Sequence, residues 1–259
     1  MKTVVLGLML VLGLTLPVSA ADLVVPGTGD GVAVLNALSV EFKKRAGFDV
    51  EFPKSIGSSG GIVAAGTGQA EIARVAREIK GKEAEYGLTY KPIFRIPTVF
   101  YITKDVAIKN LTRTQIIDIF SGKIVNWAAV GGENKEIKVI ARETTDSSLE
   151  SLRETFPGFG ELKFPDKAIV ARKTPDMLLI MTHEKSAIGF GPLDVAIENK
   201  ITYVSVDGVK AQDANYKYKG NIGLVFKNGK LSPAAKTFLE FVDTKEASKV
   251  ISDFGGTSL

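Results

Sequence analysis

The stretch FPKSIGSSGGIVAAGTG, residues Phe52 to Gly68, places glycines and serines between an extended run and a segment of small residues. Glycine lets the backbone approach another group closely, and a serine hydroxyl both donates and accepts hydrogen bonds. The free N–H groups at the start of a helix carry partial positive charge. The stretch therefore predicts a loop and a helix N-terminus that can hold an anion.

The composition is that of an ordinary globular protein. The chain has 259 residues, 45% hydrophobic and 24% charged, which is enough for a large core or two smaller lobes. The net charge is only +4 and the basic residues are scattered, so nucleic-acid binding is not expected. Since the chain has no cysteine and one histidine, disulfides and cysteine-ligated metals are excluded, and we expect neither a metal nor another cofactor.

Residues 1–20 have the features of a secretory signal peptide. An early lysine, Lys2, precedes an apolar run from Val4 to Leu16 and a short stretch of small residues. We expect cleavage after Ala20 or Ala21 and a periplasmic protein without a lipid anchor, because no cysteine is available for one. An uncleaved N-terminal anchor is the alternative, although the apolar run is short for a membrane span.

Strands alternate with helices along the rest of the chain, which favours an α/β fold. Apolar spacing and capping residues predict helices over 32–46, 61–70, 112–121, 147–156 and 232–254. Strands are predicted over 48–52, 71–76, 91–103, 137–142, 186–193 and 201–209. In the third of these helices, Thr112 is the expected N-cap, and in the fourth Ser147 and Glu150 have the spacing of a capping box.

Three segments share the order strand, polar or glycine-rich loop, helix: Gly27–Gly31, Ser55–Gly61 and Arg142–Ser148. Capping alone explains any one of them, because every α/β protein needs turn glycines and N-caps. Three together, one beginning with an arginine at a strand end, favour a ligand held by converging helix N-termini.

A second interpretation makes Ser59 a nucleophile. Gly57, Ser59 and Gly61 fit the G-x-S-x-G spacing of a hydrolase, and the single histidine, His183, follows later in the chain. The pattern is weak in any loop rich in glycine and serine, so an exported serine hydrolase stays a minor alternative. A dinucleotide fingerprint is excluded, because Val32 occupies the third glycine position after Gly27 and Gly29.

Four stretches together resemble the phosphate-binding proteins of phosphate ABC importers: IGSSGG (56–61), LTRTQIIDIFSGKIVNW (111–127), IKVIARETTDSS (137–148) and SAIGFGPL (186–193). The resemblance implies a two-lobed type II periplasmic binding protein fold with two crossover hinge strands and a ligand cleft between the lobes. The implied crossovers lie near Pro97–Thr103 and Tyr203–Asp207. The implied lobes are residues 21–100 with 206–259, and residues 101–205.

The resemblance also implies ligand contacts. Ser58 falls on a contact of the family, and Arg142 falls on the arginine that pairs with phosphate. Ser148 keeps a hydroxyl at a threonine position, whereas Asp146 replaces a ligand-binding serine. The resemblance and the three loops together give one predicted ligand-binding set: Gly31, Ser58, Ser59, Gly60, Arg142, Asp146, Ser147 and Ser148. Additional candidates are Thr28, Asp30, Arg74 and Arg77.

One departure from the family concerns ligand choice. The family has an aspartate that accepts the proton of hydrogen phosphate, and this chain has Ala76 there, between Arg74 and Arg77. An acceptor-only carboxylate rejects a fully deprotonated oxyanion such as sulfate, so its loss relaxes that discrimination. Asp146 could restore the acceptor from the other lobe, or it could only cap its helix.

We therefore predict a monomeric periplasmic solute-binding protein that captures a small oxyanion, phosphate first, and delivers it to the membrane permease of an ABC importer. It is not expected to be an enzyme. A ligand-sensing subunit and a binder of a sulfate-like or carboxylate anion are the alternatives.

Overall fold

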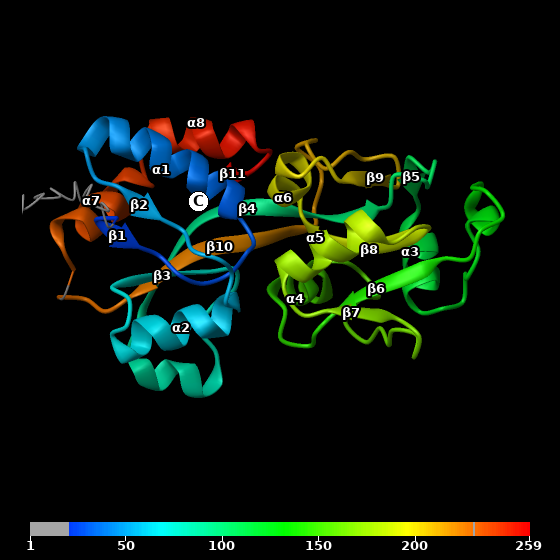
Figure 1. Cartoon of the computed structure of the whole chain (residues 1–259), viewed down its shortest axis with the longest axis horizontal. Helices are drawn as coiled ribbons and strands as arrows, with labels where there is room; N and C mark the ends of the chain where they lie inside the picture. Colours follow the sequence, from blue (N-terminus) through cyan, green and yellow to red (C-terminus); the bar gives the residue numbers. More distant parts are fainter. Residues whose placement is uncertain (1–20, 230) are drawn as a thin grey trace, which may run out of the picture.

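Two lobes joined by two long strands form the protein, of which this computed structural model describes residues 21–229 and 231–259 (Figure 1). The strands are β4 (Thr89–Ile102) and β10 (Lys219–Phe226). The predicted signal peptide, residues 1–20, lies outside the described residues. Within the described part of the chain, no helix has the length and apolar character needed to cross a membrane.

The first lobe is built on the antiparallel strands β3, β10 and the first part of β4. Its elements are β1 (Leu23–Val24), α1 (Val32–Ala46), β2 (Val50–Glu51), α2 (Gly57–Thr67), β3 (Ile72–Val75), the 3-10 helix η1 (Gly81–Tyr86), α7 (Pro233–Phe241), α8 (Lys245–Asp253) and β11 (Thr257–Ser258). In Figure 1, α1 and α8 lie on one side of the strands and α2 lies on the other.

The second lobe continues the same sheet. Strand β4 pairs antiparallel with β8 and β9, and β6 pairs parallel with β7 and β8. The elements are β5 (Asn110–Leu111), α3 (Arg113–Phe120), the 3-10 helix η2 (Trp127–Val130), β6 (Lys138–Arg142), α4 (Ser147–Thr155), β7 (Ile169–Ala171), α5 (Thr174–His183), β8 (Ala187–Pro192), α6 (Leu193–Glu198) and β9 (Thr202–Val206).

The chain crosses between the lobes at Pro97–Thr98 and again at Tyr218–Lys219. Strand β4 pairs with β10 through Pro97 and with β8 from Thr98 onward. The segment expected to form the second crossing, Tyr203–Asp207, instead largely lies in β9, which pairs with β4 inside the second lobe. These pairings favour an end of the second lobe near Lys217 rather than at residue 205.

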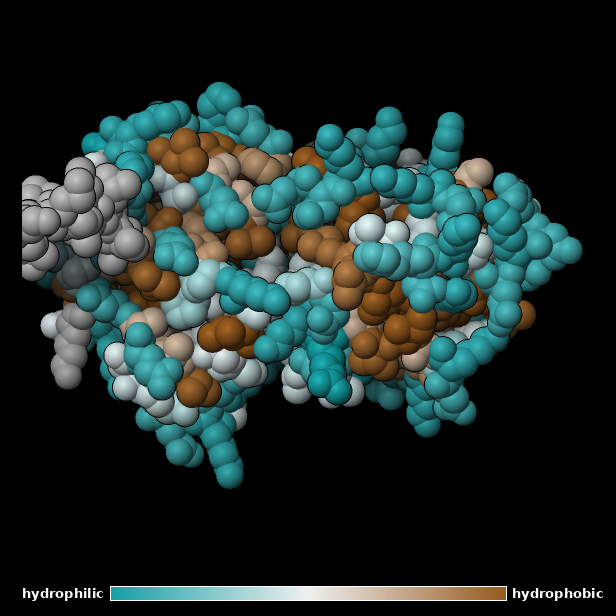
Figure 2. All heavy atoms as spheres, in the orientation of Figure 1, coloured by the Kyte–Doolittle hydropathy of each residue, from teal (hydrophilic) through white to brown (hydrophobic). Residues whose placement is uncertain are grey.

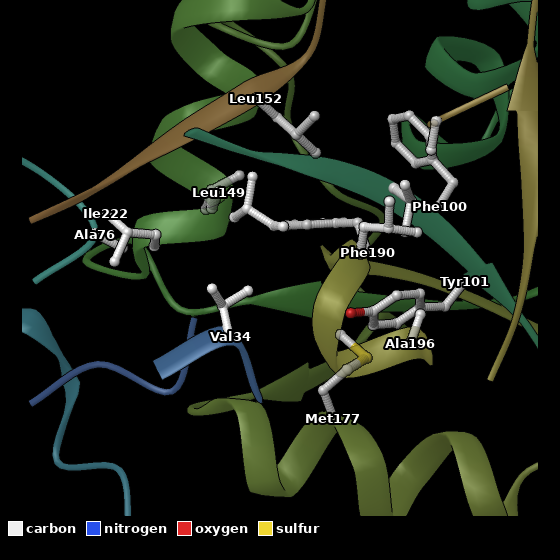
Figure 3. Close-up of a cluster of buried hydrophobic side chains, with 14 of the residues drawn as sticks. Val34, Ala76, Phe100, Tyr101, Leu149, Leu152, Met177, Phe190, Ala196 and Ile222 are labelled. Carbon is white, nitrogen blue, oxygen red and sulfur yellow. The ribbon is translucent and has the colours of Figure 1, made fainter. Parts of the chain in front are cut away.

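The larger of two buried apolar clusters contains side chains from both lobes. Val34 of α1, Leu149 of α4 and Ile222 of β10 belong to the same buried cluster, and Figure 3 shows them converging from different elements. In the second lobe, Phe100 and Phe190 contribute to a group of aromatic rings whose neighbouring centroids lie 5.2–6.3 Å apart. On the face drawn in Figure 2, hydrophilic side chains lie over the narrow junction between the two lobes.

Local capping explains most helix ends. Gly47, with φ +79°, ends α1, and the hydroxyl of Thr112 accepts from the Gln115 N–H at the start of α3, as predicted. The C-terminal segment was predicted as one helix, but it forms two helices. Helix α7 ends at Phe241, and Thr244 is the N-cap of α8. Helix α2 begins at Gly57, earlier than predicted, so its serines lie in its first turn.

Gly27 fixes the first loop against strand β3. Its φ is +144°, and the Thr28 N–H donates to the Arg74 carbonyl oxygen at 3.1 Å. A Cβ atom at this position would lie 1.9 Å from that same oxygen. No side chain fits without moving the backbone of one of the two segments.

We expect Gly27→Ala to lower the free energy of unfolding by more than about 2 kcal/mol, because both the φ angle and the contact oppose a Cβ. Gly47→Ala is the control, since Gly47 also has a positive φ but a Cβ added there would meet no atom within 4 Å; it should cost about 1 kcal/mol. Urea denaturation of both variants measures the difference. If Gly27→Ala and Gly47→Ala lowered the free energy of unfolding equally, the contact with Arg74 would not constrain the loop.

Candidate anion-binding site

Four segments from the two lobes meet at one small pocket. Its lining residues come from the first loop, the start of α2, the loop between β6 and α4, and the loop between β7 and α5: Thr28, Gly29, Asp30, Ser55, Gly57, Ser58, Arg142, Glu143, Thr145, Asp146, Ser147, Arg172, Lys173 and Thr174. The pocket volume is only about 30 Å³. The two lobes are therefore closed on one another at this point.

Three helices begin at the pocket. Ser58 of α2, Ser147 of α4 and Thr174 of α5 all lie in first turns and are buried. Neither Ile56 nor Lys173, the N-caps of α2 and α5, makes a side-chain capping bond to the helix. Free N–H groups and aligned helix dipoles from both lobes therefore favour a negative charge here.

Arg142 supplies the positive charge of the pocket from the end of β6. Its side chain is 1% exposed, and its Nη2 donates to the Asp146 carboxylate. Its Nε and Nη1 are buried without a hydrogen-bond partner in the structure. Burial on its own lowers the pKa of Arg142, but the carboxylates of Asp146 and Asp30 outweigh it and raise the pKa. The guanidinium is thus a buried cation with unused donors.

Asp146 both caps α4 and pairs with Arg142. Its Oδ1 accepts from the Leu149 N–H at 3.1 Å, and its Oδ2 accepts from the guanidinium. Asp146, rather than Ser147, is therefore the N-cap of α4, which is one of the two roles that the sequence left open for Asp146. The Ser147 hydroxyl is free for a different contact because the Asp146 carboxylate already makes the capping bond to the Leu149 N–H.

Three side-chain hydrogen bonds cross the cleft. The hydroxyls of Ser58 and Ser147 lie 2.8 Å apart. The Ser148 hydroxyl donates to Asp30 Oδ2 at 2.7 Å, and the Thr174 hydroxyl donates to Asp30 Oδ1 at 3.1 Å. Each bond joins a first-lobe residue to a second-lobe residue, and all of these side chains except Ser148 also line the pocket.

Asp30 is the second carboxylate of the pocket and is 5% exposed. Burial, followed by the charge of Asp146, raises the pKa of Asp30 to about 6, although Arg142 and the two hydroxyl donors act in the opposite direction. Asp30 therefore titrates close to the range in which phosphate changes charge.

Residue 76 is an alanine, so it has no carboxylate to offer a ligand. It is 7% exposed, and its backbone N–H donates to the Ser58 hydroxyl oxygen at 3.0 Å. In Figure 3 its side chain lies beside Ile222. The acceptor that the family resemblance places here is absent, and the buried carboxylates of the pocket come from Asp30 and Asp146 instead.

Arg74 lies beneath the pocket rather than in it. Its side chain is fully buried and donates to the backbone carbonyl oxygens of Val25, Thr28 and Pro53. Burial lowers the pKa of Arg74 to about 10. Each of its three guanidinium nitrogens donates to a backbone carbonyl oxygen, and Arg74 is not among the residues that line the pocket, so its role here is structural.

We expect Arg74→Met to reduce the free energy of unfolding by more than about 3 kcal/mol, because two buried carbonyl groups and one partly buried carbonyl group lose their donor. Arg45→Met is the matched control, since Arg45 makes an exposed surface pair with Glu246; it should change stability by less than about 0.5 kcal/mol. Chemical denaturation measures both values. Full stability of the Arg74 variant would contradict the structural assignment.

Ser59 and Arg77 lie beside the pocket and contact one another. The Arg77 Nη2 donates to the Ser59 hydroxyl oxygen at 2.8 Å and to Glu83 at 2.7 Å. His183, the proposed partner of Ser59 in a hydrolase, bonds the Leu179 carbonyl at the end of its own helix. No hydrogen bond joins this serine and this histidine, so the hydrolase arrangement is not formed.

Gly31 and Gly60 are not brought to the pocket wall. Gly31 adopts φ +74° as the N-cap of α1, where the Ala33 N–H donates across the lobes to Asp194 Oδ2 at 3.2 Å. Burial, with a contribution from Asp30, raises the pKa of Asp194 to about 7. The N-terminus of α1 thus holds a carboxylate of the protein itself.

Ser55 and Gly57 of the pocket lie within the predicted segment Ser55–Gly61, but the segment that contributes Arg172, Lys173 and Thr174 was missed from the sequence. A signal for Thr174 exists, because Pro175 and Asp176 after it mark a helix start. Among the described residues, no group of three or more histidine, cysteine, aspartate or glutamate side chains could hold a metal ion.

Comparisons with known proteins agree with this architecture. A family profile described as "PBP superfamily domain" matches residues 17–246. Phosphate-binding protein PstS of Borreliella burgdorferi is 24% identical over 199 residues, 71% of each chain, and PstS of Bacillus subtilis is 26% identical over 164 residues, 60% of this chain and 52% of that protein.

A crystal structure of a putative phosphate ABC transporter substrate-binding protein from Clostridium perfringens, with bound phosphate, has a TM-score of 0.80. It is 27% identical and covers 92% of this chain and 99% of its own. The expected two-lobed type II fold is confirmed.

Proposed function

The chain belongs to the PBP superfamily, and on that premise we propose that it captures inorganic phosphate between its lobes and delivers it to the permease of an ABC importer. It is a binding protein and not an enzyme. The related chains named above bind phosphate or take part in phosphate transport according to their names, which supports phosphate as the ligand here.

The observation that carries the proposal is the buried, partly unpartnered guanidinium of Arg142. A buried donor without a partner requires an explanation, and an anion at Nε and Nη1 supplies one. The helix N-termini of α2, α4 and α5 converge on the same pocket. Charge-assisted hydrogen bonds contribute about 1.5–3 kcal/mol each, so a few of them give tight binding even after the costs of association.

Ligand exchange requires the lobes to separate. The pocket volume is only about 30 Å³, and side-chain hydrogen bonds between the two lobes close it. Phosphate therefore enters an open form, and contacts made only in the closed form draw the lobes together. The two strands that join the lobes, β4 and β10, are the elements about which such a motion would occur.

Outside the pocket, a set of ion pairs also joins the lobes. Glu150 of α4 pairs with Lys80 and lies 3.7 Å from Arg77 Nε, while Glu154 lies 3.7 Å from Lys80. Arg77 and Lys80 belong to the first lobe. These pairs stabilise the closed form without contacting the proposed ligand.

We further propose that the mature protein is a periplasmic monomer, exported by residues 1–20. The absence of cysteine from the sequence supports a diffusible form without a lipid anchor.

Arg142→Ala should weaken phosphate binding at least a hundredfold, because two charge-assisted hydrogen bonds of about 1.5–3 kcal/mol are lost. Isothermal titration calorimetry measures the Kd, and a cooperative thermal transition checks that the variant is folded. An unchanged Kd in a folded variant would remove Arg142 from the site.

Glu150→Gln should weaken phosphate binding about threefold to tenfold, because a partly exposed ion pair contributes about 1 kcal/mol to closure. Lys80→Gln should have a similar effect, and the double variant should show less than the sum of the two losses. Glu41→Gln, which removes a surface pair with Lys44, is the control. Additive losses at Glu150 and Lys80 would contradict their direct coupling.

A further inference from the structure

Two carboxylates from opposite lobes face the single buried cation of the pocket. Asp30 comes from the first loop and Asp146 from the start of α4, and both raise the pKa of Arg142 by their charge. The Asp146 side chain is 9% exposed and Asp30 is 5% exposed. With both carboxylates ionised, the buried centre carries a net charge of −1 before any ligand enters.

The other charged and titratable groups around Asp30 do not reverse this balance. Arg172 is exposed, and Lys173 and Glu143 are half-buried, so solvent screens their charges at the edge of the pocket. On the inner side, burial holds the pKa of Tyr101 well above its usual range, so its hydroxyl stays neutral. Asp194 of α6, also buried, can only add negative charge.

Both carboxylates keep the capacity to accept further hydrogen bonds. Asp30 accepts one hydroxyl on each oxygen, and Asp146 accepts one N–H on each. An ionised carboxylate oxygen accepts about two hydrogen bonds and donates none. A ligand that meets both groups must therefore bring its own donors. Sulfate has none, dianionic phosphate has one, and monoanionic phosphate has two.

We propose that the site binds phosphate as the monoanion, with one of its P–OH groups donating to Asp30 and the other to Asp146 while its remaining oxygens accept from Arg142 and the helix N-termini. This inference rests on the proposed function and names the ionic form of the ligand. No covalent bond changes, and each proton stays shared between a phosphate oxygen and a carboxylate oxygen. The same pairing disfavours phosphate monoesters, whose monoanion has only one P–OH group.

The proposal predicts the pH dependence of binding. Above neutral pH, free phosphate is mainly the dianion and Asp30, with a pKa of about 6, is ionised, so forming the complex takes up one proton. The Kd should therefore rise about tenfold per pH unit above neutrality. An ordinary single-acceptor site admits the dianion and shows a much flatter profile.

Calorimetry of the full mature protein with inorganic phosphate between pH 5.5 and 8.5 tests this directly. Repeating the titration at pH 8 in buffers of different ionisation enthalpy gives the number of protons taken up, which should be close to one. Sulfate should give no heat at concentrations at which phosphate saturates the site.

Asp30→Asn and Asp146→Asn extend the test, because an amide keeps the shape and removes the charge. Each should flatten the pH profile, and the double variant should bind sulfate. Asparagine also caps helices, so the second variant should keep α4. Asp49→Asn, at a surface pair with Lys43, is the control and should leave the profile unchanged.

The outcomes separate the two proposals. Absence of phosphate binding at every pH in the folded protein would overturn the proposed function and this inference with it. Phosphate binding with the same Kd at pH 6 and pH 8.5, without proton uptake, would overturn the inference alone. The wild-type profile and proton count decide the question even if a variant fails to fold.

Discussion

The guanidinium of Arg142 is almost wholly removed from water, and this burial governs the rest of the site. A buried cation needs anions or acceptors close by, and the chain supplies one carboxylate from each lobe. Two of the three guanidinium nitrogens still have no partner. The pocket is therefore charged, enclosed and incompletely satisfied, which suits a small anion that completes its hydrogen bonding.

The supporting structure serves to keep these groups in place. Arg74, a second buried arginine, donates all its hydrogen bonds to backbone carbonyls and so orders the loops around the pocket. Gly27 allows the first loop to lie against the strand that carries Arg74. Because the cleft contacts join residues from opposite lobes, an anion held between them would couple its own capture to lobe closure. The ion pairs of Glu150 add to closure from outside the pocket.

Much of this arrangement could be predicted from the sequence, because caps, stop glycines and apolar spacing act locally. The ends of α1 and α3 follow from Gly47 and Thr112, and the loops with Ser58 and Arg142 do meet. The contacts that depend on tertiary structure could not be predicted. Arg74 and Arg142 both lie on strands near loops, and only the folded chain decides which guanidinium turns to carbonyl oxygens. The second crossing was misplaced because a strand pattern does not reveal its pairing partner. Thr174 was overlooked because its loop lacks the glycine and serine content of the others.

The most direct test of the central claim is a crystal structure of the mature protein grown with phosphate near pH 6. Our account expects the ion in the pocket between the lobes, with oxygens within hydrogen-bond distance of Arg142 Nε or Nη1 and of N–H groups at the start of α2 or α4. It also expects oxygens of Asp30 and Asp146 within hydrogen-bond distance of the ion. Phosphate bound elsewhere, or in this pocket without a contact to Arg142, would contradict it.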